Sequence, residues 1–111
     1  MTLYCVGPLP EDPLAAAAHF HNEELPKIRR TTGTMTTGRL TIVFAPAEYT
    51  HRAWRLAVTQ GLAREHAPLR INAIESDDDA AIAATAAYLA GADGVTGQFL
   101  PLDGAGAGKV V

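Results

Sequence analysis

Tyr49 and Arg52 are the two side chains whose types and spacing could support acid–base chemistry. Residues three apart on a helix face the same side, so the arginine charge could stabilise the ionised form of the tyrosine hydroxyl. Arginine, however, does not release its own proton and presents a planar fork of donors, unlike lysine. Two interpretations of the pair stay open: a proton-transfer couple, or two surface residues at the start of a helix.

The other reactive side chains have simpler structural explanations. His19 and His21 are two residues apart, which on a helix directs them about 200° apart, so they cannot share a metal. We expect all four histidines, His19, His21, His51 and His66, to be solvated and to form no metal site. The acidic run Asp77–Asp79 fits the first turn of a helix, where the helix dipole favours negative charge. Cys5 is expected to be a small core residue, because no basic group is near it in sequence.

Composition limits the class of protein. The 111 residues suffice for one small domain, and the 48% hydrophobic content argues against disorder. A net charge of −3 without a basic stripe argues against a nucleic-acid partner. No apolar stretch approaches the roughly 18 residues of a membrane span, and no signal peptide is recognisable. The single cysteine excludes an internal disulfide and fits a cytoplasmic protein.

These side chains must be positioned by alternating strands and helices. Asp12 followed by Pro13 marks a helix start, and Pro26 should kink or end that helix. Ser76 with Asp79 forms a capping box for the last helix. The apolar patterns predict strands at residues 2–6, 39–45, 70–74 and 98–102, and helices at 14–25, 50–67 and 80–90.

A β-α-β-α-β-α-β order predicts the fold class. It implies an α/β domain with four parallel strands, right-handed crossovers and helices on both faces of the sheet. Residues 103–111 form a glycine-rich tail after the last strand.

Two stretches resemble the short-chain dehydrogenase/reductase family. Residues 53–74, AWRLAVTQGLAREHAPLRINAI, are similar to the helix after the active-site tyrosine and lysine and to the next strand. Residues 80–104, AAIAATAAYLAGADGVTGQFLPLDG, are similar to the family's late helix and its closing VTGQ and LDG motifs. The resemblance covers the C-terminal half of the family domain, so it implies a three-layer Rossmann-like half domain spanning residues 1–111 as a single truncated unit, with the first two helices on one face.

The resemblance also shows departures from the family's catalytic pattern. The tyrosine position falls on Glu48 and the lysine position on Arg52, while Tyr49 lies one residue away. The family's serine, which precedes the tyrosine, has no counterpart, because no serine or threonine stands between residues 45 and 48. The glycines at 104–108 cannot replace the family's nucleotide-binding turn, because too few residues follow them to build a phosphate-binding helix. We therefore expect no cofactor, unless a partner supplies the nucleotide-binding half for NAD or NADP.

Three functions stay open on these grounds. The first is a non-catalytic module derived from the dehydrogenase family, a pseudoenzyme acting through a homo-oligomer or a complex with a full-length relative. The second is a residual or repurposed NAD(P)-dependent oxidoreductase, which could complete its site with a partner chain. The third is small-molecule binding at the carboxyl ends of the strands. The interface residues expected for the first function are Trp54, Ala57, Gly61, Leu3 and Cys5.

Overall fold

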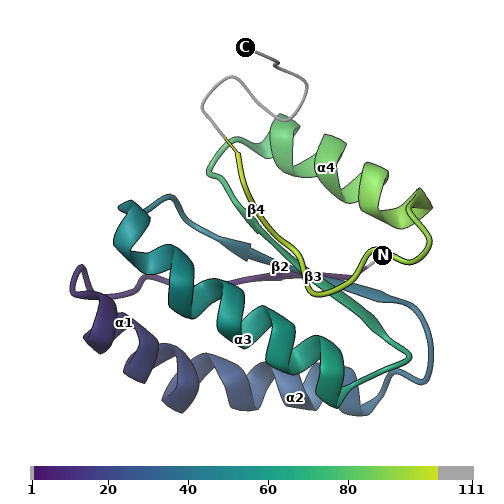
Figure 1. Cartoon of the computed structure of the whole chain (residues 1–111), viewed down its shortest axis with the longest axis horizontal. Helices are drawn as coiled ribbons and strands as arrows, with labels where there is room; N and C mark the ends of the chain where they lie inside the picture. The colour runs from purple at the N-terminus through teal and green to yellow at the C-terminus, as the bar shows by residue number, and fades with distance from the viewer. Residues whose placement is uncertain (1, 103–111) are drawn as a thin grey trace.

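A computed structural model describes residues 2–102, so the glycine-rich tail predicted at 103–111 lies outside the described residues. Four strands run parallel in the order β1-β2-β3-β4. Figure 1 shows α2 and α3 on one side of this sheet and α4 on the other, which confirms the predicted α/β fold. The elements are β1 (Thr2–Cys5), α1 (Pro13–His19), the π-helical η1 (Phe20–Glu24), α2 (Leu25–Gly33), β2 (Arg39–Phe44), the 3-10 turn η2 (Tyr49–His51), α3 (Arg52–Glu65), β3 (Arg70–Glu75), α4 (Asp79–Gly91) and β4 (Phe99–Pro101).

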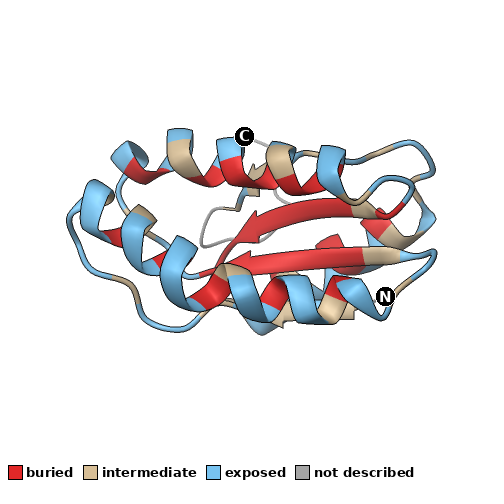
Figure 2. Ribbon diagram, turned by 90° about the horizontal axis from the view of Figure 1, so that it is seen from below, coloured by how far each residue is buried: buried red, intermediate tan, exposed pale blue. Residues whose placement is uncertain are grey.

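The core lies along the two central strands. Residues 40–44 of β2 and 71–75 of β3 are all buried, and Figure 2 shows the buried positions following these strands and the inward sides of the helices. Phe20 fills the space between the helices and the sheet, with ring centroids 5.5 Å from both Phe44 and Trp54. Burying one such aromatic side chain contributes about 1.5–3 kcal/mol. Within residues 2–102, no helix is long and apolar enough to cross a membrane.

Of the two outcomes predicted at Pro26, a kink or an end, the helix does not end there. The backbone N–H of Leu25 donates to the carbonyl of Phe20, which closes a wide π-helical turn. Pro26 then falls in the first turn of α2, where a missing N–H interrupts no hydrogen bond. The helix therefore continues to Gly33.

The N-terminal cap of α1 was predicted correctly, and the cap of α4 was not. Asp12 caps α1 as expected, because its Oδ2 accepts from the Ala15 N–H at 2.9 Å. The capping box of Ser76 with Asp79 was wrong: Asp78 is the cap of α4. The Ser76 N–H donates to the Phe44 carbonyl at 3.0 Å, so this residue still extends the ladder between β2 and β3 and the helix begins later.

The two motifs that carry the family resemblance bind each other. Asn72 Nδ2 donates to the Val95 carbonyl at 3.1 Å, and its Oδ1 accepts from the Gln98 N–H at 3.0 Å. Gly97 donates its N–H to the Ile71 carbonyl at 2.7 Å and has a φ of 74°, a conformation that favours glycine. The asparagine and the VTGQ segment thus hold β4 against β3.

Tyr4 ties the edge strand β1 to the π-helical segment. Its hydroxyl donates to Glu24 Oε1 at 2.8 Å, and Lys27 Nζ lies 3.8 Å from Glu24 Oε2. Burial, and after it the hydrogen bond and negative charge of Glu24, raise the pKa of Tyr4 from 10.0 to about 12. The folded chain therefore holds this proton more tightly than the unfolded chain does.

This raised pKa predicts a loss of stability in alkaline solution. The Tyr4 contribution is complete below the unfolded pKa of 10.0 and is lost as the pH rises toward about 12, because only the unfolded chain then releases the proton. Tyr4→Phe should remove this part of the pH dependence in urea unfolding followed by circular dichroism. Tyr88→Phe, at an exposed position, is the control and should keep the wild-type dependence. An unchanged dependence in Tyr4→Phe would contradict the assignment.

Candidate functional site

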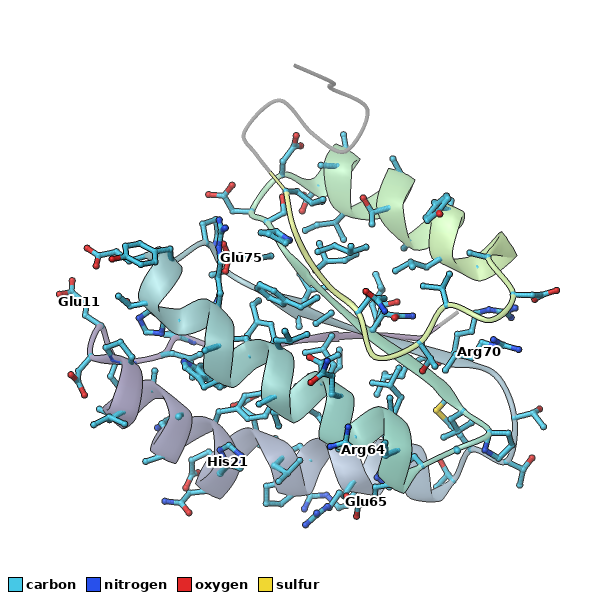
Figure 3. All side chains as sticks on the ribbon, viewed as in Figure 1. Glu11, His21, Arg64, Glu65, Arg70 and Glu75 are labelled. Carbon is cyan, nitrogen blue, oxygen red and sulfur yellow. The ribbon has the colours of Figure 1, made fainter. Side chains whose placement is uncertain are left out.

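A cleft of about 590 Å³ opens where β1 and β2 end. Its walls are the loop after β1, with lining residues between 7 and 12, and residues 45–48 after β2; His51 and Arg55 line it from the side of α3. Figure 3 places Glu11 and Glu75 toward this end of the molecule and Arg70 toward the opposite end. Open α/β sheets bind ligands beyond the carboxyl ends of their strands, so this cleft is the candidate site.

Arg55 is a buried charge beside the cleft. Only 2% of the residue is exposed, and its Nη1 donates to Glu75 Oε1 at 2.8 Å and to the Ala45 carbonyl at 2.9 Å. Its guanidinium carbon also lies 4.5 Å from the centre of the Phe44 ring. Burial lowers the pKa of Arg55, while the Glu75 carboxylate opposes that effect. The arginine therefore joins α3 to the ends of β2 and β3.

His51 is a second buried polar group in the cleft. Its Nδ1 lies 3.2 Å from Trp54 Nε1, and its Nε2 lies 2.8 Å from the Glu11 carbonyl. Because an indole N–H only donates, Nδ1 must accept, and the ring hydrogen belongs on Nε2, which donates to Glu11. The histidine was expected to be solvated, which is wrong: 3% of it is exposed, since it faces the loop after β1. His19 and His21 are exposed.

The proposed acid–base pair lies on the surface. Tyr49 belongs to the 3-10 turn η2 and is 77% exposed, and Arg52, the first residue of α3, is also exposed. Among the described residues, neither side chain has a hydrogen bond or an ion pair that would hold it in place. The structure therefore does not hold the tyrosine hydroxyl against the arginine.

Carboxylates surround the cleft opening. Glu11, Asp12 and Glu48 are exposed, and within residues 2–102 none of them forms an ion pair. One oxygen of Asp12 is occupied as the cap of α1. In the same part of the chain, no three His, Cys, Asp or Glu side chains converge as metal ligands would. The cleft thus offers separated acceptors. Both ring nitrogens of His51 and Nη1 of Arg55 are engaged in structural hydrogen bonds, while the buried Nε of Arg55 has no partner among the described residues.

The residues predicted for a helical interface line a second hollow. This groove of about 380 Å³ lies between the η1–α2 segment and α3 and is lined by Trp54, Ala57 and Gly61 among others. Ala57 is exposed and Gly61 partly so, whereas Trp54 is half-buried against Phe20. The groove therefore combines small surface residues with one large aromatic side chain.

The residues predicted for an interface on β1 are both exposed. Leu3 is 44% exposed, and Cys5 is exposed as well, so the expectation of a core cysteine is wrong. Burial alternates along this edge strand, and Leu3 and Cys5 occupy the side opposite the half-buried Tyr4. An apolar run predicts a strand, but it does not say whether both faces are covered.

Sequence reasoning did not assign roles to His51, Arg55 and Glu75. The available signals were weak: an arginine three residues after Arg52, and a glutamate directly following an apolar strand. Arg55 and Glu75 can both be buried because each neutralises the other in the folded chain, although they are 20 residues apart in the sequence. Such a pair could be suspected only after the helix and the strand had been placed together.

Comparison with known proteins gives one family. A family model described as short chain dehydrogenase-like protein matches residues 4–102. No curated protein and no solved structure matches the chain. The family match includes the residues that line the cleft and most of the sheet.

The Arg55–Glu75 pair predicts an unequal response to two kinds of substitution. Glu75→Ala leaves a buried charge without its partner and should lower the free energy of unfolding by about 3–5 kcal/mol. Removing Glu65 from its pair with Arg29, whose side chains are 46% and 52% exposed, should cost about 0–1 kcal/mol. Urea unfolding measures both. Replacing the buried pair together, as Arg55→Met with Glu75→Leu, should restore much of the loss; equal losses in the single and double variants would argue against the pairing.

Proposed function

Because this chain belongs to the short-chain dehydrogenase-like family, we propose that it is a non-catalytic member that acts by assembling with another subunit. The observation that carries this proposal is the use of the cleft's buried polar groups. His51 binds the Glu11 carbonyl, and Arg55 binds Glu75 and the Ala45 carbonyl. Groups engaged in this way support the structure and are not free to exchange protons with a substrate.

The residues at the catalytic positions support the same proposal. The resemblance assigns the tyrosine position to Glu48 and the lysine position to Arg52. Glu48 cannot serve as the phenol that donates a proton to a carbonyl, and arginine does not replace the ammonium of lysine as a point charge. Tyr49, the neighbouring phenol, is 77% exposed.

The outer side of α3 supports assembly. Ala53 and Ala57 are exposed and Gly61 is partly exposed, so small residues recur every four positions along that side. Small residues allow two helices to approach closely. The resemblance implies that subunits pair through these helices. The partner in this proposal is a second copy of the chain or a full-length relative.

The cleft itself favours a second candidate function, which is small-molecule binding. Its volume of about 590 Å³ is in the range of ligand sites. A related possibility is a repurposed oxidoreductase whose nucleotide-binding half comes from a partner chain. Calorimetric titration with NADH and NADPH, first with the chain alone and then with a co-purified relative, separates the repurposed oxidoreductase from a purely structural subunit.

The non-catalytic proposal predicts that the purified 111-residue chain does not turn over NADH or NADPH with carbonyl substrates. A missing catalytic proton donor alone lowers a rate by about 10²-fold or more. The measurement is absorbance at the reduced-nicotinamide band, which should not fall with NADH or NADPH and a panel of ketones and aldehydes, and should not rise with NAD or NADP and a panel of alcohols. Steady turnover that Tyr49→Phe abolishes would overturn the proposal and make Tyr49 the acid.

If subunits assemble through the exposed side of α3, a substitution there should lower the mass of the particle in solution. Ala57→Arg places a long charged side chain on the exposed side of α3, where it should block close helix approach and lower the mass measured by sedimentation. Ala83→Arg, at an exposed position on α4, is the matched control and should keep the wild-type mass. Because both positions are exposed on helices, neither change should prevent folding. An Ala57→Arg mass equal to that of wild type would contradict the helical surface.

A further inference from the structure

The outer edge of β1 has no strand beside it in the part of the chain that the structure describes. β1 pairs in parallel with β2, and it is the first strand in the sheet order. Figure 1 shows β1 crossing behind α3. A free strand edge presents a row of N–H and C=O groups that another strand can bind.

The hydrogen bonds to β2 show which residues present those groups. The Val6 N–H donates to the Val43 carbonyl at 2.9 Å, so Val6 points its backbone groups toward β2. Backbone groups of successive residues in a strand point to opposite edges. Thr2 and Tyr4 therefore also point toward β2, and Leu3 and Cys5 point their N–H and C=O groups outward.

The side chains around this edge do little to prevent pairing. Leu3 and Cys5 are exposed, and residues 2–10 contain no charged residue. Soluble proteins ordinarily protect an edge with charge, with proline or with a covering element. The prolines of this segment, Pro8 and Pro10, come after the strand. Because the whole chain carries a net charge of −3, an uncharged segment is where two copies can approach with the least repulsion.

We propose that β1 pairs with β1 of a second copy, antiparallel and centred on Tyr4. The outward residues Leu3 and Cys5 are symmetric about residue 4, so a twofold axis places Leu3 opposite Cys5 of the partner subunit. Such directly opposed residues exchange both N–H···O=C bonds. The two symmetric pairs make four backbone hydrogen bonds and join two four-stranded sheets into one.

A twofold arrangement explains why the second copy, and not an unrelated strand, is the fitting occupant. An isologous interface requires a surface that is complementary to itself, and it closes at a dimer. The edge of β1 meets that requirement because residues 2–10 carry no charged side chain, so two copies of this net negative chain can place the same segment against itself without repulsion. This inference rests on the proposed function in that the chain acts through assembly, and it names a partner and a surface separate from α3.

Single-cysteine proteins test the register directly. In the proposed pairing, Cys5 lies opposite Leu3 of the partner subunit and only diagonal to the partner's Cys5. Wild type carries Cys5 alone, and the variant Leu3→Cys with Cys5→Ser carries a cysteine at position 3 alone. Directly opposite Cβ atoms are about 4.5–5.5 Å apart and diagonal ones about 7–8 Å, so a mixture of the two proteins should form a disulfide heterodimer about tenfold faster than either forms a homodimer.

Mass spectrometry under non-reducing conditions identifies the products of mild oxidation, because the two chains differ in mass. A heterodimer excess supports the proposed register. Homodimers of wild type that form as fast as the heterodimer would overturn it in favour of a pairing centred on Cys5. The absence of any fast crosslink in the mixture would overturn the strand pairing altogether.

A proline substitution tests the backbone contribution. Leu3→Pro removes one outward N–H and leaves the bonds of β1 to β2 intact, so it should yield a folded monomer. Leu3→Ala keeps that N–H and is the matched control, which should stay dimeric by sedimentation at micromolar concentration. Circular dichroism checks folding, and if Leu3→Pro does not fold, the crosslinking result decides.

The two proposed surfaces fail in different ways. Loss of mass in Leu3→Pro but not in Ala57→Arg supports the edge and contradicts the helical surface. The reverse result overturns the edge inference and leaves the proposed function standing. A wild-type chain that is monomeric in sedimentation overturns the edge inference, while co-purification with a full-length relative would still support the proposed function.

Discussion

A buried positive charge determines how helix α3 lies on the sheet. An isolated guanidinium in a protein interior costs several kcal/mol, so Arg55 is tolerated there only with its partners in place. The Glu75 carboxylate neutralises the charge, the Ala45 carbonyl accepts a further hydrogen bond, and the Phe44 ring lies against the guanidinium. These contacts come from three separate segments, so the wall of the cleft cannot move without exposing or unpairing the charge.

The same arrangement limits the chemistry of the cleft. A residue that transfers protons needs access to the substrate and must be able to change its charge at small cost. Arg55 is locked by a carboxylate, and both ring nitrogens of His51 are occupied by Trp54 and the Glu11 carbonyl. His51 and Arg55 therefore stabilise the loops that follow β1 and β2, through the carbonyls of Glu11 and Ala45.

The fold was largely predictable because its signals are local. Continuous apolar and β-branched runs predicted the four strands, and their alternation with helices predicted a parallel sheet in sequential order. What sequence reasoning missed depends on position in space. The exposure of Cys5 follows from its place on an edge strand, the burial of His51 from the loop folded over it, and the Arg55–Glu75 pair from contact between a helix and a strand. Ser76 was misassigned because the strand runs farther than its apolar residues do.

The π-helical turn sets the rotational phase of the first helix. Its buried residues are Ala16, Phe20, Glu24, Ile28 and Thr32, a spacing of four throughout. In a regular α-helix a spacing of four advances about 40° around the axis at each step, so the last of these side chains would face nearly opposite to the first. A turn closed by five residues rotates less per residue and removes much of that drift. The wide turn in mid-helix therefore allows the buried residues before it and those after it to face the same side of the sheet.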